Sequence, residues 1–522
     1  MAKGSSNELV GRTHSARPVR SLFRRFLKDQ AGVTALLFGL TLVPVMGFVG
    51  ASVDYANAYR LRAKLQNALD SAALAAAREM DTSSDEDAAH QVGDEVLQAN
   101  LGNSFPTGVT ASFSIADSVV TATADLPVNT YLLSVIGIDT VPVGVTSVVN
   151  IAGGTFEVAL VLDNSGSMAG SKISDLRSAA TNLVEILFAN QLSSDHVSIG
   201  LAPFAASVNV GTQFSNASWM DQTGQSSIHK EHFDSSVTRW EMFNALNNVN
   251  WGGCVEVRPS PHDVADSPPA GGDSLFVPMF APDEPDTSGS YINNYIDDDD
   301  GSCPAWVSGG SNDTRQRRTC KYQGESADTN LSNGTRRGPN HLCDSQPLQA
   351  LTNNSGEITN AINAMQAYGG TNIVEGLMWG WRLLSPEEPF AEGKSYTEEN
   401  NTKIILLMSD GQNFHLGSST HNQSWFNAFG YHAQGRLGSP SNSTSALRAT
   451  MNARTEQACV NAKAAGIVIY ALALEISDQS TEDMLRDCAS GSSKFFTLDD
   501  SDTLDEVFEA IAKEISKLRI TS

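Results

Sequence analysis

Three oxygen-bearing side chains directly follow a run of apolar residues in the stretch EVALVLDNSGSM, which begins at Glu157. The apolar residues end at Asp163, and Ser165 and Ser167 come next at alternate positions. A short apolar run of this kind is typical of a buried strand. Ligands of open parallel sheets gather where the strands end. The spacing therefore predicts a binding site that contains one carboxylate and two hydroxyls.

Two later segments add oxygen atoms of the same kinds. Thr371 stands in the Gly-flanked turn of YGGTNIVEG, and Asp410 follows the apolar run of IILLMSDG. Together with Asp163, Ser165 and Ser167 they offer two carboxylates and three hydroxyls. This donor set suits a hard divalent cation, with Mg²⁺ as the first expectation and Mn²⁺ or Ca²⁺ as alternatives. A vacant coordination position on such an ion would attract a carboxylate from another molecule.

The elements that must position these residues alternate between strand and helix from Phe156 onward. Such alternation predicts an α/β fold, a doubly wound and mostly parallel sheet covered by helices on both faces, over residues 155–520. The predicted strands are FEVALVLD, HVSIGLAPFA, KIILLMSD, IVIYALALE and KFFTL. The predicted helices are SKISDLRSAATNLVEILF, EITNAINAMQA, NIVEGLMWGWRLL, ALRATMNARTEQACVNAKAAG and DTLDEVFEAIAKEISKL.

The alternation is lost between residues 211 and 346, a segment rich in Ser, Asn, Asp, Gly and Pro. A structureless loop of this length is unusual inside a compact domain, so we expect an inserted subdomain held by disulfides. Four of the six cysteines lie in it, and Cys459 and Cys488 are candidates to pair with each other, although six cysteines allow 15 connectivities. The absence of CxxC pairs argues against a zinc site. The four are Cys254, Cys303, Cys320 and Cys343.

The charge and hydropathy pattern of the N-terminal part predicts a membrane anchor. Residues 1–30 hold seven Lys or Arg and two acids, a net charge of +5, and the 23 residues of 31–53 contain no charge. That run is long enough to span a bilayer as a helix, and the basic head keeps the N-terminus in the cytoplasm. We therefore expect an inner-membrane, single-pass protein whose bulk is periplasmic or extracellular. A buried core helix is the alternative.

The charge of the chain is uneven. Its formal charge is −25, so the remainder without the +5 segment carries −30. The chain after residue 30 is acidic enough to repel nucleic acid and to favour binding of cations or basic partners.

Residues 54–150 form the next expected unit. Leu61, Leu65, Leu69 and Ala73 recur every four residues, so the helix is expected to continue to about Met80. The alternating runs TASFSIADSVVTATADLPV and VPVGVTSVVNIAG predict strands of a small sheet. The result is a small pilin-like α+β domain.

The run D-N-S-G-S-M resembles the D-x-S-x-S signature of the von Willebrand factor type A fold, and Thr371 and the S-D-G at Asp410 resemble its other two metal loops. The resemblance implies a metal-ion-dependent adhesion site. It implies that Ser165 and Ser167 coordinate the ion directly and Thr371 directly or through water. Asp163 and Asp410 would act mainly through bound waters.

Residues 24–78, with their basic start, apolar run, Asp54 and the series LQNALDSAALAAA, resemble the membrane-proximal segment of TadE/TadG-like proteins of tight-adherence (Flp-type) pilus assembly. TadG-like members also carry a type A domain. The resemblance implies partners among pilus-assembly or pilin-like proteins, or a host or surface ligand with an exposed Asp or Glu. The alternative is a mainly structural membrane-complex subunit in which a metal only stabilises the loops.

No constellation for catalysis is evident, so we expect no enzyme. The esterase-like motif GGDSL, with Ser274, lacks a preceding strand and a late His. The run of Asp297–Asp300 is interpreted as a solvated acidic loop. The remaining expectations are surface positions for His229, His232 and His262, and core positions for Trp379 and Trp381.

Overall fold

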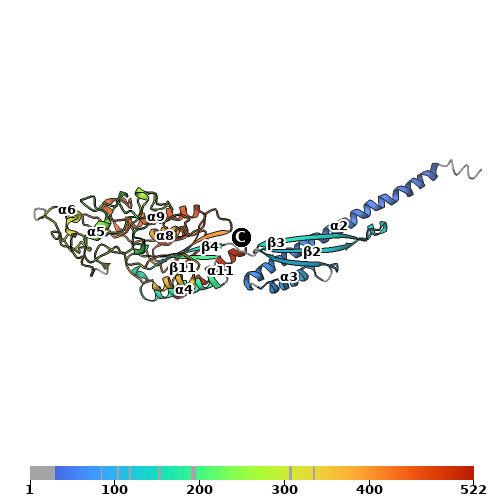
Figure 1. The fold of residues 1–522 in the computed structure, drawn as a ribbon, viewed down its shortest axis with the longest axis horizontal. Helices are drawn as coiled ribbons and strands as arrows, with labels where there is room; N and C mark the ends of the chain where they lie inside the picture. The colour runs from blue at the N-terminus through green and yellow to red at the C-terminus, as the bar shows by residue number, and fades with distance from the viewer. Residues whose placement is uncertain are drawn as a thin grey trace, which may run out of the picture. The chain divides into compact units, whose positions relative to one another are not determined.

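The structure is a computed structural model that describes residues 30–83, 85–102, 105–116, 119–150, 155–189, 196–304, 309–332 and 335–521. The basic segment predicted for residues 1–30 lies outside the described residues, apart from Gln30. The chain divides into two compact units, Met1–Ala152 and Gly153–Ser522, and each is described by itself (Figure 1).

The first unit packs a long helix against a small antiparallel sheet, as the sequence predicts. Helix α2 (Gln30–Ser83) lies on the sheet β1-β2-β3, and its residues Leu65 and Leu69 pack against Ala122 and Ala124 in the shared core. The strands are β1 (Thr110–Ala116), β2 (Val119–Asn129) and β3 (Thr140–Asn150), and a 3₁₀ turn, η1 (Leu133–Ile136), lies between the last two.

A second helix of this unit, α3 (Glu86–Leu101), was not predicted. Asp85 caps it by accepting hydrogen bonds from the backbone N–H groups of Asp87 and Ala88. Its buried positions, Ala89, Gly93, Leu97 and Leu101, recur every four residues. The capping acid and this spacing are the signals in the sequence that indicate the helix.

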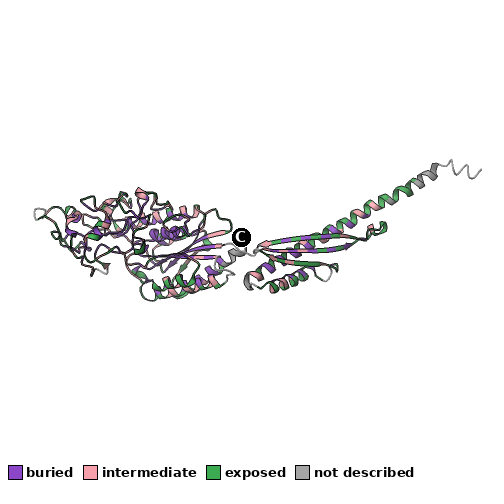
Figure 2. Cartoon of the chain, in the orientation of Figure 1, coloured by how far each residue is buried: buried purple, intermediate pink, exposed green. Residues whose placement is uncertain are grey.

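The first part of α2 is apolar and exposed. Within the described residues, the stretch Leu37–Met80 is the one helix long and apolar enough to cross a membrane, with a mean hydropathy of 1.6 over its most apolar window. The side chains near its start, including Phe38, Met46 and Phe48, have no protein neighbours that bury them (Figure 2). This helix indicates a membrane-anchored protein.

Asp54 joins α2 to the loop between β2 and β3. Its buried carboxylate accepts hydrogen bonds from the backbone N–H groups of Tyr131 (3.0 Å), Leu132 (2.9 Å) and Leu133 (2.8 Å). Because these three backbone N–H groups would lose a charged acceptor, we expect Asp54→Ala to destabilise the loop locally. Hydrogen exchange of residues 131–138, followed by mass spectrometry, should become much faster.

The exposed acid Asp94 on α3 provides the control, since Asp94→Ala removes a carboxylate of the same unit without touching the loop. Unchanged exchange in Asp54→Ala would show that the three hydrogen bonds do not hold the loop.

The second unit is an α/β fold with a mostly parallel sheet, which confirms the predicted fold class. The strand order is β11-β10-β9-β4-β5-β8, and only β8 (Gln349–Thr352), an edge strand that was not predicted, runs antiparallel to its neighbour. The parallel strands are β4 (Thr155–Asp163), β5 (Val197–Phe204), β9 (Asn401–Ser409), β10 (Val468–Leu474) and β11 (Phe495–Leu498).

Helices cover both faces of this sheet because its central strands are apolar on both sides. Along β4, Val158, Leu160 and Leu162 belong to the core of one face, and Ala159 and Val161 to the core of the other. The first face carries α4 (Ser171–Ala189), α7 (Ser355–Ala364) and α11 (Leu504–Thr521). The second carries α8 (Ile373–Leu383), α9 (Thr444–Ala464) and α10 (Gln479–Cys488).

The segment between β5 and β8 has little regular structure but a large buried core. It contains the short helices α5 (Arg239–Ala245) and α6 (Asn312–Arg317) and the two-residue strands β6 (Leu331–Ser332) and β7 (Thr335–Arg336). Trp219, Phe276 and Phe280 join the same hydrophobic cluster as Val161 and Trp379 of the sheet layer. The segment therefore shares its core with the sheet. The core positions predicted for Trp379 and Trp381 are confirmed.

The prediction of surface histidines in this segment was wrong for His229 and His232, which are buried, whereas His262 is half-buried. Nδ1 of His229 lies 2.9 Å from a carboxylate oxygen of Asp221, and its Nε2 accepts a hydrogen bond from the backbone N–H of Arg239. A buried imidazole needs such partners, and here both are supplied within the irregular segment.

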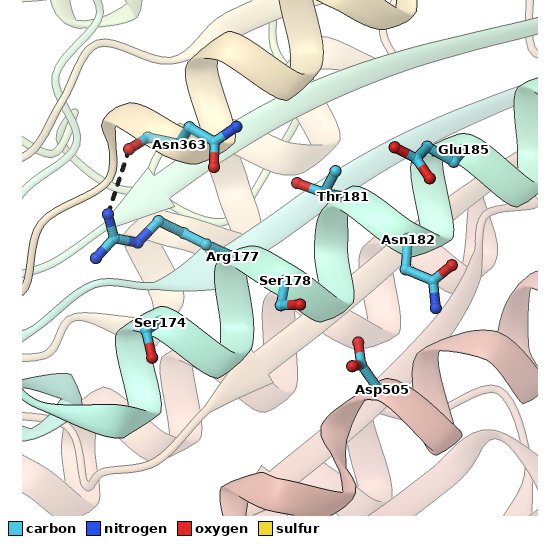
Figure 3. A pocket seen from close by; sticks show the side chains of 8 residues that line it. All are labelled: Ser174, Arg177, Ser178, Thr181, Asn182, Glu185, Asn363 and Asp505. Carbon is cyan, nitrogen blue, oxygen red and sulfur yellow. Dashed lines mark hydrogen bonds between the residues drawn. The ribbon is translucent and has the colours of Figure 1, made fainter.

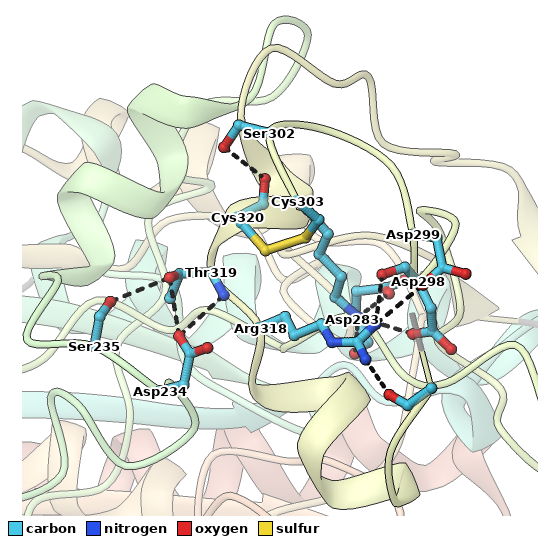
Figure 4. Close-up of a disulfide and its surroundings, with 12 residues drawn as sticks. Asp234, Ser235, Asp283, Asp298, Asp299, Ser302, Cys303, Arg318, Thr319 and Cys320 are labelled. Atoms are coloured by element: carbon cyan, nitrogen blue, oxygen red, sulfur yellow. Dashed lines mark hydrogen bonds and ion pairs between the residues drawn. A yellow bond between two sulfur atoms is a disulfide. The ribbon is translucent and has the colours of Figure 1, made fainter. Parts of the chain in front are cut away.

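Three disulfides staple the second unit. Cys254–Cys343 and Cys303–Cys320 lie within the irregular segment, and the predicted pairing of Cys459 with Cys488 is confirmed. Figure 4 shows the second bond with the acidic and basic side chains around it.

The acidic run beside that bond is only partly solvated. Asp297, Asp299 and Asp300 are exposed, but Asp298 is buried and lies 3.3 Å from the ammonium of Lys321. The prediction of a solvated acidic loop was therefore wrong at Asp298. A buried lysine needs carboxylates close by, and Asp298 is one of the two that Lys321 has.

Candidate metal centre

The candidate site lies where the chain leaves two neighbouring parallel strands. Leu162 of β4 pairs with Met408 of β9, so Asp163 and Asp410 emerge at the same edge of the sheet. From this edge the chain after β4 leads to β5 on one side, and the chain after β9 leads to β10 on the other. Such a reversal of direction is the usual ligand-binding position in open α/β sheets.

The structure brings all five predicted residues together. Thr371 Oγ1 donates a hydrogen bond to Ser165 Oγ (3.0 Å), and Ser165 Oγ lies 3.0 Å from Ser167 Oγ. Ser167 Oγ in turn donates to Asp410 Oδ1 (2.5 Å). Asp163 lies directly behind this chain of oxygens, since its Oδ1 accepts the backbone N–H of Ser165 (2.8 Å).

Backbone hydrogen bonds hold the three loops in place. The N–H of Gly166 donates to the carbonyl of Gly369 (2.9 Å), and the N–H of Phe414 donates to the carbonyl of Thr371 (2.8 Å). Gly369 has a φ of 75°, a conformation that a residue with a Cβ adopts at a cost. The loops are thus joined by the protein itself.

The carboxylates of Asp163 and Asp410 lie close enough for their negative charges to repel each other. Burial first, and then the nearby charge of Asp410, raise the pKa of Asp163 to about 7, against hydrogen bonds from Ser409 and Ser165 that lower it. A bound cation would favour the charged form of both acids. The donor set and its charge therefore fit a divalent ion.

Three further residues belong to the site and were missed in the sequence. Ser409 Oγ donates to Asp163 Oδ2 (2.6 Å). The ammonium of Lys172 lies 3.0 Å from Asp410 Oδ2 and 2.9 Å from a carboxylate oxygen of Glu475. Ser409 is the last residue of the strand IILLMS, beside Asp410, whereas nothing in the sequence places Lys172 or Glu475 near the three loops of the site.

The oxygens face a hollow of about 450 Å³. Ser167, Thr371 and Asp410 lie on its wall, and so do Arg448 and Glu475. Ser167 is exposed, whereas Asp163 and Ser165 are buried at the base of the site. A group that enters from solvent can therefore reach the hydroxyls of Ser167 and Thr371, which line the hollow.

Two other features of the described residues do not have this character. A hollow of about 630 Å³ lies along α4, where Arg177 bonds the backbone carbonyl of Asn363, and its polar side chains do not form a network around one point (Figure 3). Ser274 of the esterase-like motif donates to the carbonyl of Gly271 and accepts the N–H of Ala270, so its hydroxyl is engaged in its own turn.

In the part of the chain that the structure describes, no group of three His, Cys, Asp or Glu side chains is placed to hold a metal. The candidate centre contains two carboxylates and three hydroxyls, so it is a site of a different kind. Oxygen ligands of this kind suit a hard divalent cation.

Solved structures similar to this chain include three with low identity. They are the von Willebrand factor domain of the type V pili tip protein Mfa5 from Porphyromonas gingivalis (11% identity, 70% of this chain and 96% of that chain, TM-score 0.33), a mutant of the PilB minor pilin from Streptococcus sanguinis (13%, 81% and 82%, TM-score 0.33), and proximal thread matrix protein 1 from the mussel byssus with a zinc-occupied MIDAS motif (12%, 70% and 46%, TM-score 0.28). Because these TM-scores are low, the site rests on the geometry above.

No curated protein matches this chain. Residues 32–79, which lie within α2, match the family described as Flp pilus-assembly TadE/G-like. Over this segment, the N-terminal helix of the chain is therefore similar to the TadE/G-like family of Flp pilus assembly.

Proposed function

We propose that this chain is a membrane-anchored, metal-dependent binding component of a tight-adherence (Flp-type) pilus system. Asp163, Ser165, Ser167, Thr371 and Asp410 hold a divalent cation, Mg²⁺ in the first place. The cation supplies a coordination position for an acidic side chain of a partner. The partner is another pilus-assembly or pilin-like protein, or a surface ligand with an exposed Asp or Glu.

The observation that carries this proposal is the continuous chain of oxygens from Thr371 through Ser165 and Ser167 to Asp410, each within 3.0 Å of the next. Oxygens of three loops meet at one point, and the outermost of them face a hollow open to solvent. Side-chain oxygens gathered in this way are the ligands that a hard cation prefers.

The structure favours capture of a partner over a purely structural metal. The loops are already joined by backbone hydrogen bonds from Gly166 to Gly369 and from Phe414 to Thr371. A metal that only stabilised the loops would add little to these bonds. The exposure of Ser167 at the hollow leaves this part of the site accessible to a group of a partner.

The proposed location follows from the anchor. With α2 in the inner membrane and the basic N-terminus in the cytoplasm, the second unit lies in the periplasm or beyond it. The metal site is then available to other components of the pilus system.

The test is co-purification of the full-length protein from cross-linked membranes, with and without a chelator, followed by mass spectrometry of the partners. Ser165→Ala removes the central hydroxyl of the network, and Ser174→Ala removes a hydroxyl of α4 outside it. We expect the chelator and Ser165→Ala to remove the same partner, and Ser174→Ala to retain it.

A partner list that neither the chelator nor Ser165→Ala changes would refute metal-dependent capture. If Ser165→Ala instead lowers only the unfolding temperature, the metal has the structural role.

A further inference from the structure

The tip of the β2–β3 hairpin, residues 131–138 with the sequence YLLSVIGI, contains no charged residue. Its large side chains point into solvent, with Val135 82% and Tyr131 74% exposed. Leu132, Ile136 and Ile138 are exposed as well. A water-soluble surface does not gather apolar groups at one loop without a partner that covers them.

The hairpin tip is held against one short stretch of α2, residues 50–54. Asp54 accepts the N–H groups of Tyr131, Leu132 and Leu133. One turn earlier on α2, a Cβ at Gly50 would lie 2.6 Å from Cβ of Leu132, so the two backbones are in close contact there. The tip therefore lies beside residues 50–54, where the uncharged run of α2 ends.

The residues of α2 on either side of this level are those of a membrane boundary. Before it, exposed apolar side chains such as Met46, Phe48 and Val49 belong to the uncharged run. After it come exposed Tyr55 and Tyr59 and then the charges of Arg60 and Arg62. Tyrosines are enriched where a transmembrane helix leaves the hydrocarbon, and charges begin beyond them.

The tip and this part of α2 form one apolar surface. Among the described residues, only four other large hydrophobic side chains are strongly exposed, namely Leu74, Val148, Leu331 and Val460. Figure 2 shows the exposed class along the first part of α2 and at the hairpin tip. The apolar surface of the tip is therefore continuous with that of the membrane helix.

We propose that the hairpin tip inserts into the outer leaflet of the lipid bilayer beside α2, as a second membrane contact of the first unit. The inference rests on the proposed anchoring by α2. Apolar side chains at this boundary bury about 5–10 Å into the headgroup and acyl region. The carboxylate of Asp54 tolerates this position because three N–H groups surround it.

Two contacts have a consequence that one helix alone lacks. A single helix is free to tilt in any direction, whereas an inserted tip at its side resists any tilt that would lift the tip out of the bilayer. The sheet of the first unit, which is joined to both contacts, is then held at a fixed height above the bilayer.

The test uses the full-length protein in vesicles of phosphatidylethanolamine and phosphatidylglycerol, labelled with a fluorescent dye at one introduced cysteine. The native cysteines are all in disulfides and do not react. The three positions are Val135→Cys at the tip, Phe48→Cys on α2 and Ser114→Cys on β1. Ser114 pairs with Thr121, eight residues along β2 from Asn129, so it lies about 26 Å from the tip.

A nitroxide on the lipid acyl chain should quench the labels at Val135 and Phe48, whereas iodide in the water should quench the label at Ser114. If the Phe48 label is quenched by the lipid and the Val135 label by iodide, the anchor stands and the inserted tip is refuted. If iodide quenches the Phe48 label, the anchoring itself is refuted. The vesicles hold no other protein. If a partner protein rather than lipid normally buries the tip, the tip is exposed to water in this experiment, and iodide quenches the label at Val135.

Discussion

Replacing Asp410 with Asn should weaken Mg²⁺ binding about 10- to 100-fold, the loss expected when a carboxylate that acts on a metal through water or hydrogen bonds is removed. Asp410 is better suited to this test than Asp163. The carboxylate of Asp163 is fully buried and accepts hydrogen bonds from Ser165 and Ser409, so its amide would place a donor against donors. Asp410 is at the wall of the hollow, where an amide still fits.

Isothermal titration of the full-length protein in detergent with Mg²⁺ measures the affinity, and circular dichroism checks the fold. Asp487→Asn, which neutralises an exposed acid at the end of α10, gives the matched change of charge. Equal affinities of the Asp410→Asn protein and the control would show that Asp410 takes no part in the site.

Removal of the Cys254–Cys343 disulfide should lower the free energy of unfolding by about 4–5 kcal/mol, because it releases a loop of 89 residues. Cys303–Cys320 closes only 17 residues, and its removal should cost about 3 kcal/mol. The double variants are Cys254→Ala with Cys343→Ala, and Cys303→Ala with Cys320→Ala. Urea unfolding followed by tryptophan fluorescence compares them with the unchanged protein.

The first disulfide also bears on the metal loops. Beside it, the hydroxyl of Ser207 donates to the carbonyl of Leu342 (2.7 Å), and Ser345 Oγ donates to Asn164 Oδ1 (2.8 Å) next to Asp163. We therefore expect its removal to weaken Mg²⁺ binding as well, whereas removal of Cys303–Cys320 should not. A larger loss of stability from the shorter loop would contradict the chain-entropy argument.

The proximity of the five oxygen residues could be predicted because each lies next to an element with a clear pattern. Asp163 and Asp410 end apolar strands, and Thr371 stands in a glycine turn before a helix. Parallel strands deliver their ends to one edge whatever lies between them in the chain. The long segment between Ser167 and Thr371 therefore did not obscure the site.

The residues that were missed depend on relations that a single sequence does not display. Lys172 reaches Asp410 and Glu475 only because α4 begins beside β9 and β10 ends in the same place. Glu475 also adopts a φ of 51°, which directs the chain after β10 toward the site. No periodic pattern in the sequence indicates the contacts of Lys172 or the backbone conformation of Glu475.

The irregular segment could not be predicted for a similar reason. Its apolar residues, among them Trp219, Phe276 and Phe280, pack without helical or strand periodicity. His229 and His232 lie among polar residues in the sequence, yet the fold buries both. Composition indicated a polar surface there, and tertiary packing overrode it.

The central claim is that one cation joins the three loops through the hydroxyls of Ser165, Ser167 and Thr371. Anomalous X-ray diffraction from crystals of the full-length protein grown with Mn²⁺ tests it most directly. We expect a single strong peak bonded to Ser165 Oγ and Ser167 Oγ, beside Thr371 and within one water of Asp163 and Asp410. A site without a peak, in which these hydroxyls keep their direct hydrogen bonds to one another, would contradict it.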